Sequence, residues 1–347
     1  MSTEAYRQII AAPPRDRLDL FLATANRIGA PVGNVEKDFW VCWTLNSLYH
    51  ERPAGEPRLL FKGGTSLSKG YDLIKRFSED IDVTVFRDDL EEPASVEELE
   101  ALSNKKRRAK LDAIRDACGT YITGPLREFL AAQLADVTNG TGRVEIDEAD
   151  HDGQTLLLWY PEVEPRDGAY VRPAIRLESG AKSALDPNGP LTITPYVAEE
   201  APGIDLAVPD VTTIEATRTF WDKVVIAHGL RRWYERRGEL RQEGQRVSRH
   251  YYDLHCLMQS ETGKAALADL ELGADCVRHA RMFFDRPDYD LASAATGSFA
   301  IEPAPKMVDA LARDYANTTA MIFGAAPSFD DILASARQIE RELNNRA

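Results

Sequence analysis

The chain contains the stretch Phe61-Lys-Gly-Gly-Thr-Ser-Leu-Ser-Lys69, followed shortly by Ser78-Glu-Asp-Ile-Asp-Val-Thr-Val-Phe86. The first stretch places two glycines and a pair of hydroxyl residues between an apolar strand and a predicted helix. Glycines allow the backbone to approach a phosphate, and the first N–H groups of a helix are unpaired donors. The order of glycine and lysine fits neither a P-loop nor a dinucleotide fingerprint. Residues 63–66 therefore indicate either a phosphate-binding turn of another kind or an ordinary capped turn.

The second stretch predicts a strand with carboxylates at alternate positions. Side chains two residues apart leave a strand on the same face, about 6–7 Å apart. Asp80 and Asp82 therefore point together, and the apolar residues between and after them point into the core. Like charges on one face are unfavourable unless a cation lies between them. The pair indicates a site for a hard divalent cation beside a polyphosphate; the alternative is an exposed face neutralised by Lys75 or Arg76.

A third carboxylate from a neighbouring strand commonly completes such a site. In the predicted strand Ala174-Ile-Arg-Leu-Glu178, the apolar residues face inward while Arg176 and Glu178 face the other way. Glu178 is the candidate third metal ligand. An ordinary surface glutamate is the alternative.

Composition is that of a soluble globular protein. The chain has 347 residues, a hydrophobic content of 44% and a charged content of 28%. A net charge of −14 argues against a broadly basic nucleic-acid binder. No apolar run approaches the ~18 residues of a membrane span, and the N-terminus lacks the apolar core of a signal peptide. Four scattered cysteines without a CxxC pair predict free thiols, and we expect a cytoplasmic protein with no membrane partner.

Hydrophobic periodicity predicts an α+β protein: a mixed sheet with flanking helices over residues 1–205, then a helical lobe over 206–347 that packs against it. The tract 201–210 is the predicted boundary. Strands are expected at 58–61, 80–86, 143–146, 155–160, 174–178 and 191–197. Residues 15–50 are expected to form two helices, of which the second, at 34–49, is mostly buried. Further helices are expected at 65–75, 96–118, 124–137, 212–237, 246–259, 263–283, 305–323 and 328–344.

The helical half offers two further groups of polar residues. Lys223 lies among apolar neighbours of an amphipathic helix, where a lysine either reaches water or meets a phosphate. Arg249 and Asp253 lead into a later apolar helix, and Asp253 alternatively forms a structural salt bridge with Arg249 or Lys223.

With these residues in place, the chain resembles the AbiEii/AbiGii toxin family of nucleotidyltransferases, which includes the MenT toxins. The resemblance covers about residues 36–257. It depends on six motifs: Glu36-Lys-Asp-Phe-Trp40, Phe61-Lys-Gly-Gly-Thr-Ser-Leu-Ser-Lys69, Arg76-Phe-Ser-Glu-Asp-Ile-Asp82, Leu177-Glu-Ser-Gly-Ala-Lys182, Arg218-Thr-Phe-Trp-Asp-Lys223 and Arg249-His-Tyr-Tyr-Asp253.

The resemblance implies a DNA-polymerase-β-like nucleotidyltransferase fold and a toxin of a type IV toxin–antitoxin or abortive-infection system, countered by a cognate antitoxin encoded nearby. Related toxins add nucleotides to the 3′ acceptor end of tRNA, which blocks translation. Matched position by position, Ser78, Asp80, Lys223 and Asp253 are the expected catalytic residues, and Asp80 and Asp82, with Glu178, the expected Mg²⁺ ligands. The expected contacts to the NTP substrate come from Gly63, Gly64, Thr65, Ser66, Lys69, Lys223 and Arg249. Lys182 stands where many relatives carry arginine, so its role toward phosphate stays open.

Several alternatives remain at this stage. Asp253 either orients or deprotonates the attacking hydroxyl, or supports Lys223. The acceptor is RNA, favoured by arginines at 231, 232, 236, 237 and 241, or it is a protein or small-molecule hydroxyl, favoured by the acidic net charge. Ser78 leaves room for autophosphorylation or for control by an antitoxin kinase. The third hypothesis is a non-enzymatic module that senses NTP and binds a partner. Loss of catalysis usually erodes the carboxylates, whereas all the candidate positions are retained in this chain.

Overall fold

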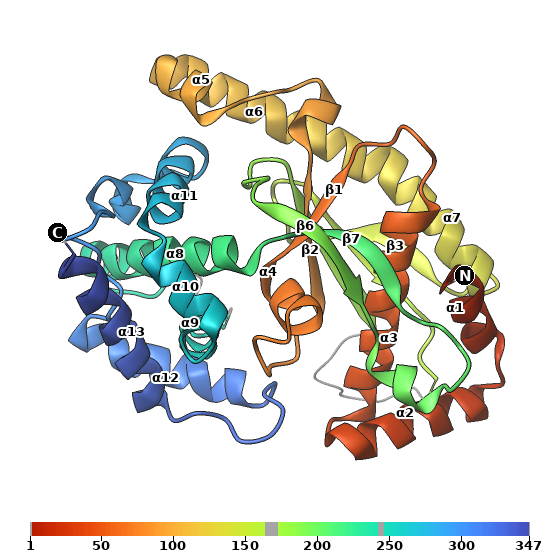
Figure 1. Cartoon of the computed structure of the whole chain (residues 1–347). Coiled ribbons are helices and arrows are strands. Elements are labelled where there is room, and N and C mark those ends of the chain that lie inside the picture. The colour runs from red at the N-terminus through yellow and green to blue at the C-terminus, as the bar shows by residue number, and fades with distance from the viewer. Residues whose placement is uncertain (1, 164–172, 242–245, 347) are drawn as a thin grey trace. The chain divides into compact units, whose positions relative to one another are not determined.

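The computed structural model describes residues 2–163, 173–241 and 246–346. The chain forms two compact units (Figure 1). The first comprises residues 1–70, 77–94 and 104–213, and the second comprises 71–76, 95–103 and 214–347. The first unit extends to Thr213, beyond the predicted boundary at residue 205, because a last strand belongs to its sheet.

A seven-stranded mixed sheet forms the centre of the first unit, in the order β3-β4-β5-β2-β1-β7-β6. β1 pairs antiparallel with β2 and parallel with β7, and β2 pairs parallel with β5. The predicted α+β class is therefore confirmed. The strands are β1 (Leu59–Lys62), β2 (Asp80–Val85), β3 (Arg143–Ile146), β4 (Thr155–Trp159), β5 (Ala174–Gly180), β6 (Asn188–Ile193) and β7 (Val208–Ile214).

Two strand predictions need correction. The strand expected at 191–197 begins earlier, at Asn188, and ends at Ile193. β7 was not expected, because Pro209 and Asp210 are poor strand formers and Asp210 has a φ of 52°. Its parallel pairing with β1 is a long-range contact that no local pattern reveals. The helix predicted from residue 212 consequently begins at Ala216.

Helices α3, α6 and α7 contact the sheet of the first unit. α3 is buried on all sides from Asn34 onward, as predicted, and Trp40 stacks on Tyr160 with ring centroids 5.3 Å apart. The helices of this unit are α1 (Ser2–Ala11), α2 (Pro14–Ile28), α3 (Val32–Asn46), α4 (Gly63–Thr65), α6 (Asn104–Tyr121) and α7 (Arg127–Val137). π-helical turns extend three of them, at Ser47–Glu51, Ser66–Gly70 and Ile122–Leu126.

The helix predicted at 65–75 is too long. Helical structure ends at Gly70, and Asp72 adopts a φ of 50°. A left-handed residue interrupts a helix, and segment 71–76 belongs to the second unit. The helix predicted at 96–118 is likewise two helices, α5 and α6, because Leu102 adopts an extended backbone conformation that ends α5 before α6 begins at Asn104.

The second unit is helical, as predicted for the C-terminal part of the chain. α8 contacts α9, α10 and α11, and α9 also contacts α13. Its helices are α5 (Val96–Ala101), α8 (Ala216–Arg237), α9 (Arg249–Met258), α10 (Glu261–Ala268), α11 (Leu270–Phe283), α12 (Pro305–Thr319) and α13 (Phe329–Asn344). The described helices include none long and apolar enough to cross a membrane.

Candidate functional site

In the first unit the glycine segment and the paired carboxylates meet directly. Gly63 has a φ of +79°, and a Cβ built on it would lie 2.1 Å from Oδ2 of Asp82. Two features require glycine at this position. The positive φ disfavours residues with a Cβ, and the Asp82 carboxylate occupies the space that a Cβ would need. The first glycine of the motif therefore makes room for the second aspartate.

The hydroxyls of the glycine segment are used inside the protein. Thr65 is fully buried, and its Oγ1 hydrogen-bonds the carbonyl oxygen of Asp80 and lies 2.8 Å from Oγ of Ser78. A hydroxyl has one proton, so when Thr65 donates to the carbonyl, Ser78 donates to Thr65. Ser66, also fully buried, donates to the carbonyl oxygen of Gly63 at 2.9 Å. Thr65 thus joins the turn to the beginning of β2, and Ser66 closes the turn on itself.

Asp80 and Asp82 lie on the same face of β2, as predicted. Both are partly exposed, whereas Ile81 and Val83 are fully buried. Each carboxylate has a cationic residue on a neighbouring strand. Lys62 Nζ lies 3.9 Å from Oδ1 of Asp82, and Arg176 is the register partner of Asp80 on β5.

Glu178 stands beside Asp82 as its register partner on β5. Its Oε1 contacts the guanidinium of Arg176, whose Nε also lies 3.0 Å from Oδ2 of Asp147. Glu178 is therefore on the predicted face, but it already shares an ion pair. Its role as a third metal ligand stays a prediction.

The donor set fits a magnesium ion that a substrate helps to hold. The described residues include no group of three or more His, Cys, Asp or Glu side chains placed to hold a metal ion. Mg²⁺ is usually bound by one or two carboxylates together with substrate phosphates and water, not by an all-protein cage. Asp80 and Asp82, partly exposed on one face beside the glycine turn, match that requirement.

Lys69 and the carboxylate of Asp38 form a buried ion pair. Lys69 Nζ lies 2.8 Å from Oδ1 of Asp38, with side chains 5% and 3% exposed, and 3.6 Å from the centroid of the Tyr196 ring. Burial lowers the pKa of a lysine, but the charge of Asp38 more than offsets this and raises the pKa of Lys69 above its usual range. The nucleotide contact of Lys69 stays a prediction. In the structure the ammonium group of Lys69 is held in a buried ion pair with Asp38.

The second unit contains a buried ionic cluster around Asp253, which is 0% exposed. Arg76 binds it in a bidentate manner, Nε to Oδ1 at 2.8 Å and Nη2 to Oδ2 at 2.9 Å. Lys223 Nζ lies 2.8 Å from Oδ2. We define these three residues as the Asp253 cluster. The sequence suggested a salt bridge between Lys223 and Asp253, but not the participation of Arg76, which it offered instead as a neutraliser of Asp80 and Asp82.

The charges within the Asp253 cluster determine its protonation. Burial alone would raise the pKa of Asp253, but the charges and hydrogen bonds of Arg76 and Lys223 hold it below its usual range. Burial lowers the pKa of Lys223, and the charges of Arg76 and Arg249 lower it further, although Asp253 opposes this. Both oxygens of Asp253 are occupied by cations, so the carboxylate is a poor proton acceptor. The geometry favours the supporting role among the three that the sequence left open.

Arg249 begins α9, and its charge acts on Lys223 and on its neighbour His250. Burial, followed by the charges of Lys223 and Arg249, keeps the pKa of His250 well below its usual range, so this imidazole is neutral. The charges of Arg76, Lys223 and Arg249 thus act on the same buried region as the carboxylate of Asp253.

Comparison with known proteins identifies the family. Residues 46–335 match the family described as nucleotidyl transferase AbiEii toxin, type IV TA system. A comparison with curated proteins gave no match. Among solved structures, MenT4, a nucleotidyltransferase toxin from Mycobacterium tuberculosis H37Rv, is similar at 16% sequence identity. That alignment covers 93% of this chain and 97% of that chain, with a TM-score of 0.39. Because the family match spans most of its length, the chain belongs to the AbiEii family of nucleotidyltransferase toxins of type IV toxin–antitoxin systems.

Proposed function

We propose that this nucleotidyltransferase transfers a nucleoside monophosphate from an NTP to RNA, at the 3′ acceptor end of tRNA, in a Mg²⁺-dependent reaction. The modified tRNA cannot be aminoacylated, so growth stops until a cognate antitoxin acts, and this arrest serves in defence against phage. The observation that carries the proposal is the contact between Gly63 and Asp82, which joins a phosphate-binding turn to a pair of carboxylates.

The reaction forms a bond between the acceptor hydroxyl oxygen and the α-phosphorus of the NTP, breaks the bond from that phosphorus to the pyrophosphate oxygen, and releases pyrophosphate, while the hydroxyl proton passes to water. Asp80 and Asp82 would hold Mg²⁺. When bound, the ion would neutralise the triphosphate and the charge that develops on the leaving pyrophosphate. The main-chain N–H groups of Gly63 and Gly64 would hold phosphate oxygens, while Thr65 keeps the turn fixed to β2. Positioning and electrostatic stabilisation together account for most of the rate enhancement in phosphoryl transfer.

Asp253 is proposed to keep Lys223 and Arg76 in fixed positions and not to act as the base. Two buried cations occupy its oxygens, and a carboxylate of depressed pKa accepts a proton poorly. The contacts proposed for Lys223 and Arg249 with the nucleotide, and the catalytic role of Ser78, rest on the family resemblance.

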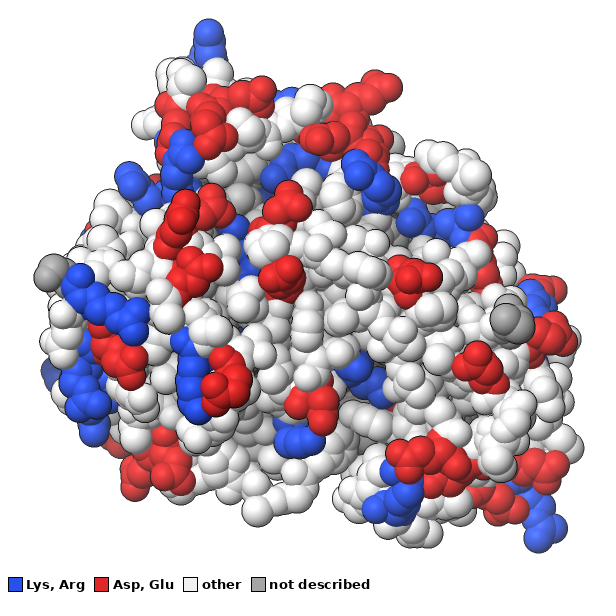
Figure 2. All heavy atoms as spheres, viewed as in Figure 1, with Lys and Arg blue, Asp and Glu red and all other residues white. Residues whose placement is uncertain are grey.

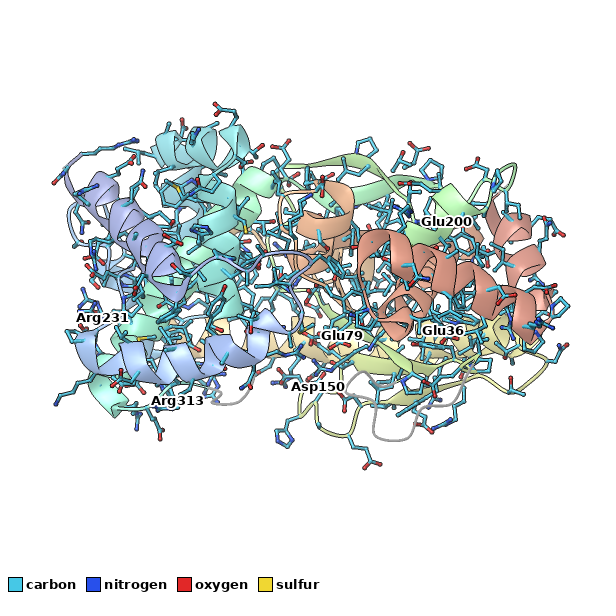
Figure 3. The ribbon with its side chains drawn as sticks, turned by 90° about the horizontal axis from the view of Figure 1, so that it is seen from below. Glu36, Glu79, Asp150, Glu200, Arg231 and Arg313 are labelled. Atoms are coloured by element: carbon cyan, nitrogen blue, oxygen red, sulfur yellow. The ribbon has the colours of Figure 1, made fainter. Side chains whose placement is uncertain are left out.

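A second acceptor class keeps some support. The arginines near the end of α8 favoured RNA in the sequence, but in the structure several are paired: Arg231, labelled in Figure 3, lies 2.7 Å from Glu235, and Arg237 lies 2.8 Å from Asp288. On the face shown in Figure 2, acidic and basic side chains are interspersed and form no continuous basic surface. Transfer to a protein or small-molecule hydroxyl is therefore the competing function, and tRNA is favoured by the family resemblance.

The test incubates the purified protein with each α-³²P-labelled NTP, Mg²⁺ and total RNA, beside an Asp80→Asn variant. Label on tRNA-sized species that depends on Asp80 supports the proposal. Asp88→Asn is the matched control, since Asp88 is an exposed aspartate that lies just beyond the same strand.

Two outcomes would count against the proposal. Label on protein or on a small molecule, but not on RNA, would favour the second acceptor class. Equal transfer by wild type and Asp80→Asn would remove the metal assignment. Expression in growing cells adds a further check, because Asp80→Asn should abolish growth arrest and Asp88→Asn should not.

A further inference from the structure

We infer that Lys37 and Asp38 of α3 are positioning residues that hold the glycine turn and the metal-binding strand in register. The inference rests on the proposed function, because it assigns these residues a task at the Asp80–Asp82 site. The sequence singled out this part of α3 only as a motif, without a role.

Lys37 holds the beginning of β2. Its Nζ lies 2.8 Å from Oε2 of Glu79, and the two side chains are 4% and 14% exposed. Glu79 directly precedes Asp80, so the ion pair fixes the backbone at the point where the first carboxylate leaves the strand. Glu36, on the same helix, and Glu79 are both labelled in Figure 3.

Asp38 holds the turn that follows the glycines. Its Oδ1 lies 2.8 Å from Nζ of Lys69, and its Oδ2 accepts a hydrogen bond of 2.7 Å from the main-chain N–H of Tyr196. Lys69 belongs to the π-helical turn Ser66–Gly70, which begins directly after Thr65. Two consecutive residues of α3 thus hold the two segments that make up the proposed site.

These two segments are also joined to each other. Thr65 bonds to the Asp80 carbonyl oxygen and to Ser78, and Gly63 lies against the Asp82 carboxylate. α3, the glycine turn and the start of β2 therefore form a closed set of three mutually bonded segments. A shift of α3 relative to either segment would change the separation of Asp80, Asp82 and the main-chain N–H groups of the turn.

The chemistry of these contacts also indicates positioning. Buried ion pairs are costly to desolvate, and well-packed apolar residues of similar size are often as stabilising or more so. Each of these pairs does, however, keep its two segments at a fixed distance, because separating a buried ammonium from its carboxylate would leave both charges uncompensated. α3 suits this task, because it is buried on all sides and cannot easily move.

The experiment measures metal affinity apart from turnover. Binding of Mn²⁺, a spectroscopic substitute for Mg²⁺, is followed by electron paramagnetic resonance in wild type, Lys37→Met and the exchanged pair Lys37→Glu with Glu79→Lys. We expect the Kd for Mn²⁺ to rise at least about tenfold in Lys37→Met, the effect typical of residues that orient metal ligands. In Lys37→Met, kcat should also fall while KM for NTP stays nearly constant. The exchanged pair should recover most of the affinity for Mn²⁺.

The control is Arg52→Met. Arg52 is a partly buried side chain of the same unit that donates to the carbonyl oxygens of Leu48 and Pro57, and it contacts none of the site residues. Its loss should lower the melting temperature and leave the Kd for Mn²⁺ unchanged. If Lys37→Met does not fold, Glu79→Gln replaces it in the measurement of Mn²⁺ binding. A glutamine at position 79 can still accept a hydrogen bond from Lys37, but it removes the negative charge.

Two negative results have different meanings. If wild type binds Mn²⁺ in an Asp80-dependent manner and Lys37→Met, or Glu79→Gln in its place, binds it equally well, the positioning role is wrong and the proposed function stands. If wild type shows no Asp80-dependent binding of Mn²⁺, with or without NTP, the metal assignment and the positioning role fall together.

Discussion

Substitution of Gly63 by alanine tests the central contact of the site. The new methyl group would lie 2.1 Å from Oδ2 of Asp82, whereas ordinary van der Waals contact begins at 3.4 Å. The oxygen must therefore retreat by about 1.3 Å, the difference between these distances. Metal ligands tolerate deviations of about 0.2 Å, and a misplacement of about 1 Å can reduce the rate of a reaction about 100-fold. We expect kcat/KM for nucleotide transfer to fall at least about 100-fold, or about 2.7 kcal/mol.

The backbone adds a separate cost, which a control can isolate. An alanine at a φ of +79° costs roughly 1–2 kcal/mol of stability. Gly55, in the same unit, has a φ of +91° and nothing within 4 Å of an added Cβ, so Gly55→Ala carries strain without the clash. Both variants should melt a few degrees below wild type, and only Gly63→Ala should lose activity.

The assay combines thermal unfolding with transfer of labelled nucleotide under saturating Mg²⁺. A Gly63→Ala enzyme with activity within about threefold of Gly55→Ala would refute the reasoning, because the clash with Asp82 would then be catalytically irrelevant. Loss of activity in both variants would show that strain, and not the Asp82 contact, is responsible.

Three other predictions concern the buried charges. Asp253→Asn removes the buried negative charge that Arg76 and Lys223 share, so the free energy of unfolding in urea should fall by about 3–5 kcal/mol; a loss below about 1 kcal/mol would contradict the buried ionic character of the Asp253 cluster. Burial raises the pKa of Asp253, but the charges of Arg76 and Lys223 outweigh burial and lower this pKa in the folded state. The ionised carboxylate therefore stabilises the protein above about pH 4, and this contribution is lost as the pH falls towards the folded pKa. Urea midpoints measured below about pH 4 should therefore decline less steeply in Asp253→Asn than in wild type. Lys69→Met should lower the melting temperature and kcat while KM for NTP stays within about threefold, since Lys69 pairs with Asp38; a tenfold rise in KM at unchanged stability would restore the predicted phosphate contact.

Alternation and turn chemistry sufficed to predict β2 and the glycine turn. Strand period places Asp80 and Asp82 on one face whatever the tertiary fold, since neighbouring side chains leave a strand on opposite sides. The two glycines at 63 and 64 likewise indicated a turn between a strand and a helix, although the contact of Gly63 with Asp82 was not visible. Local patterns also identified the buried helix α3 and the helical C-terminal part.

Contacts between distant segments were beyond reach. Arg76 is 177 positions from Asp253, and nothing in its neighbourhood shows that it pairs there and not with Asp80. The same holds for β7, whose own sequence disfavours a strand and whose partner β1 lies far away in the chain. The pairing of Lys69 with Asp38 was equally invisible, because the two residues lie in different segments of the chain and no local pattern links them.

The amino-acid sequence by itself determined the family, the α+β class and the side of the strand on which Asp80 and Asp82 lie, because motif spacing and residue period are local properties. The tertiary structure alone decided which charges are neutralised by partners: Asp253 by Arg76 and Lys223, and Lys69 by Asp38. Burying a charged side chain is costly unless an opposite charge or hydrogen bonds meet it, and in these two cases the opposite charge comes from a different segment of the chain.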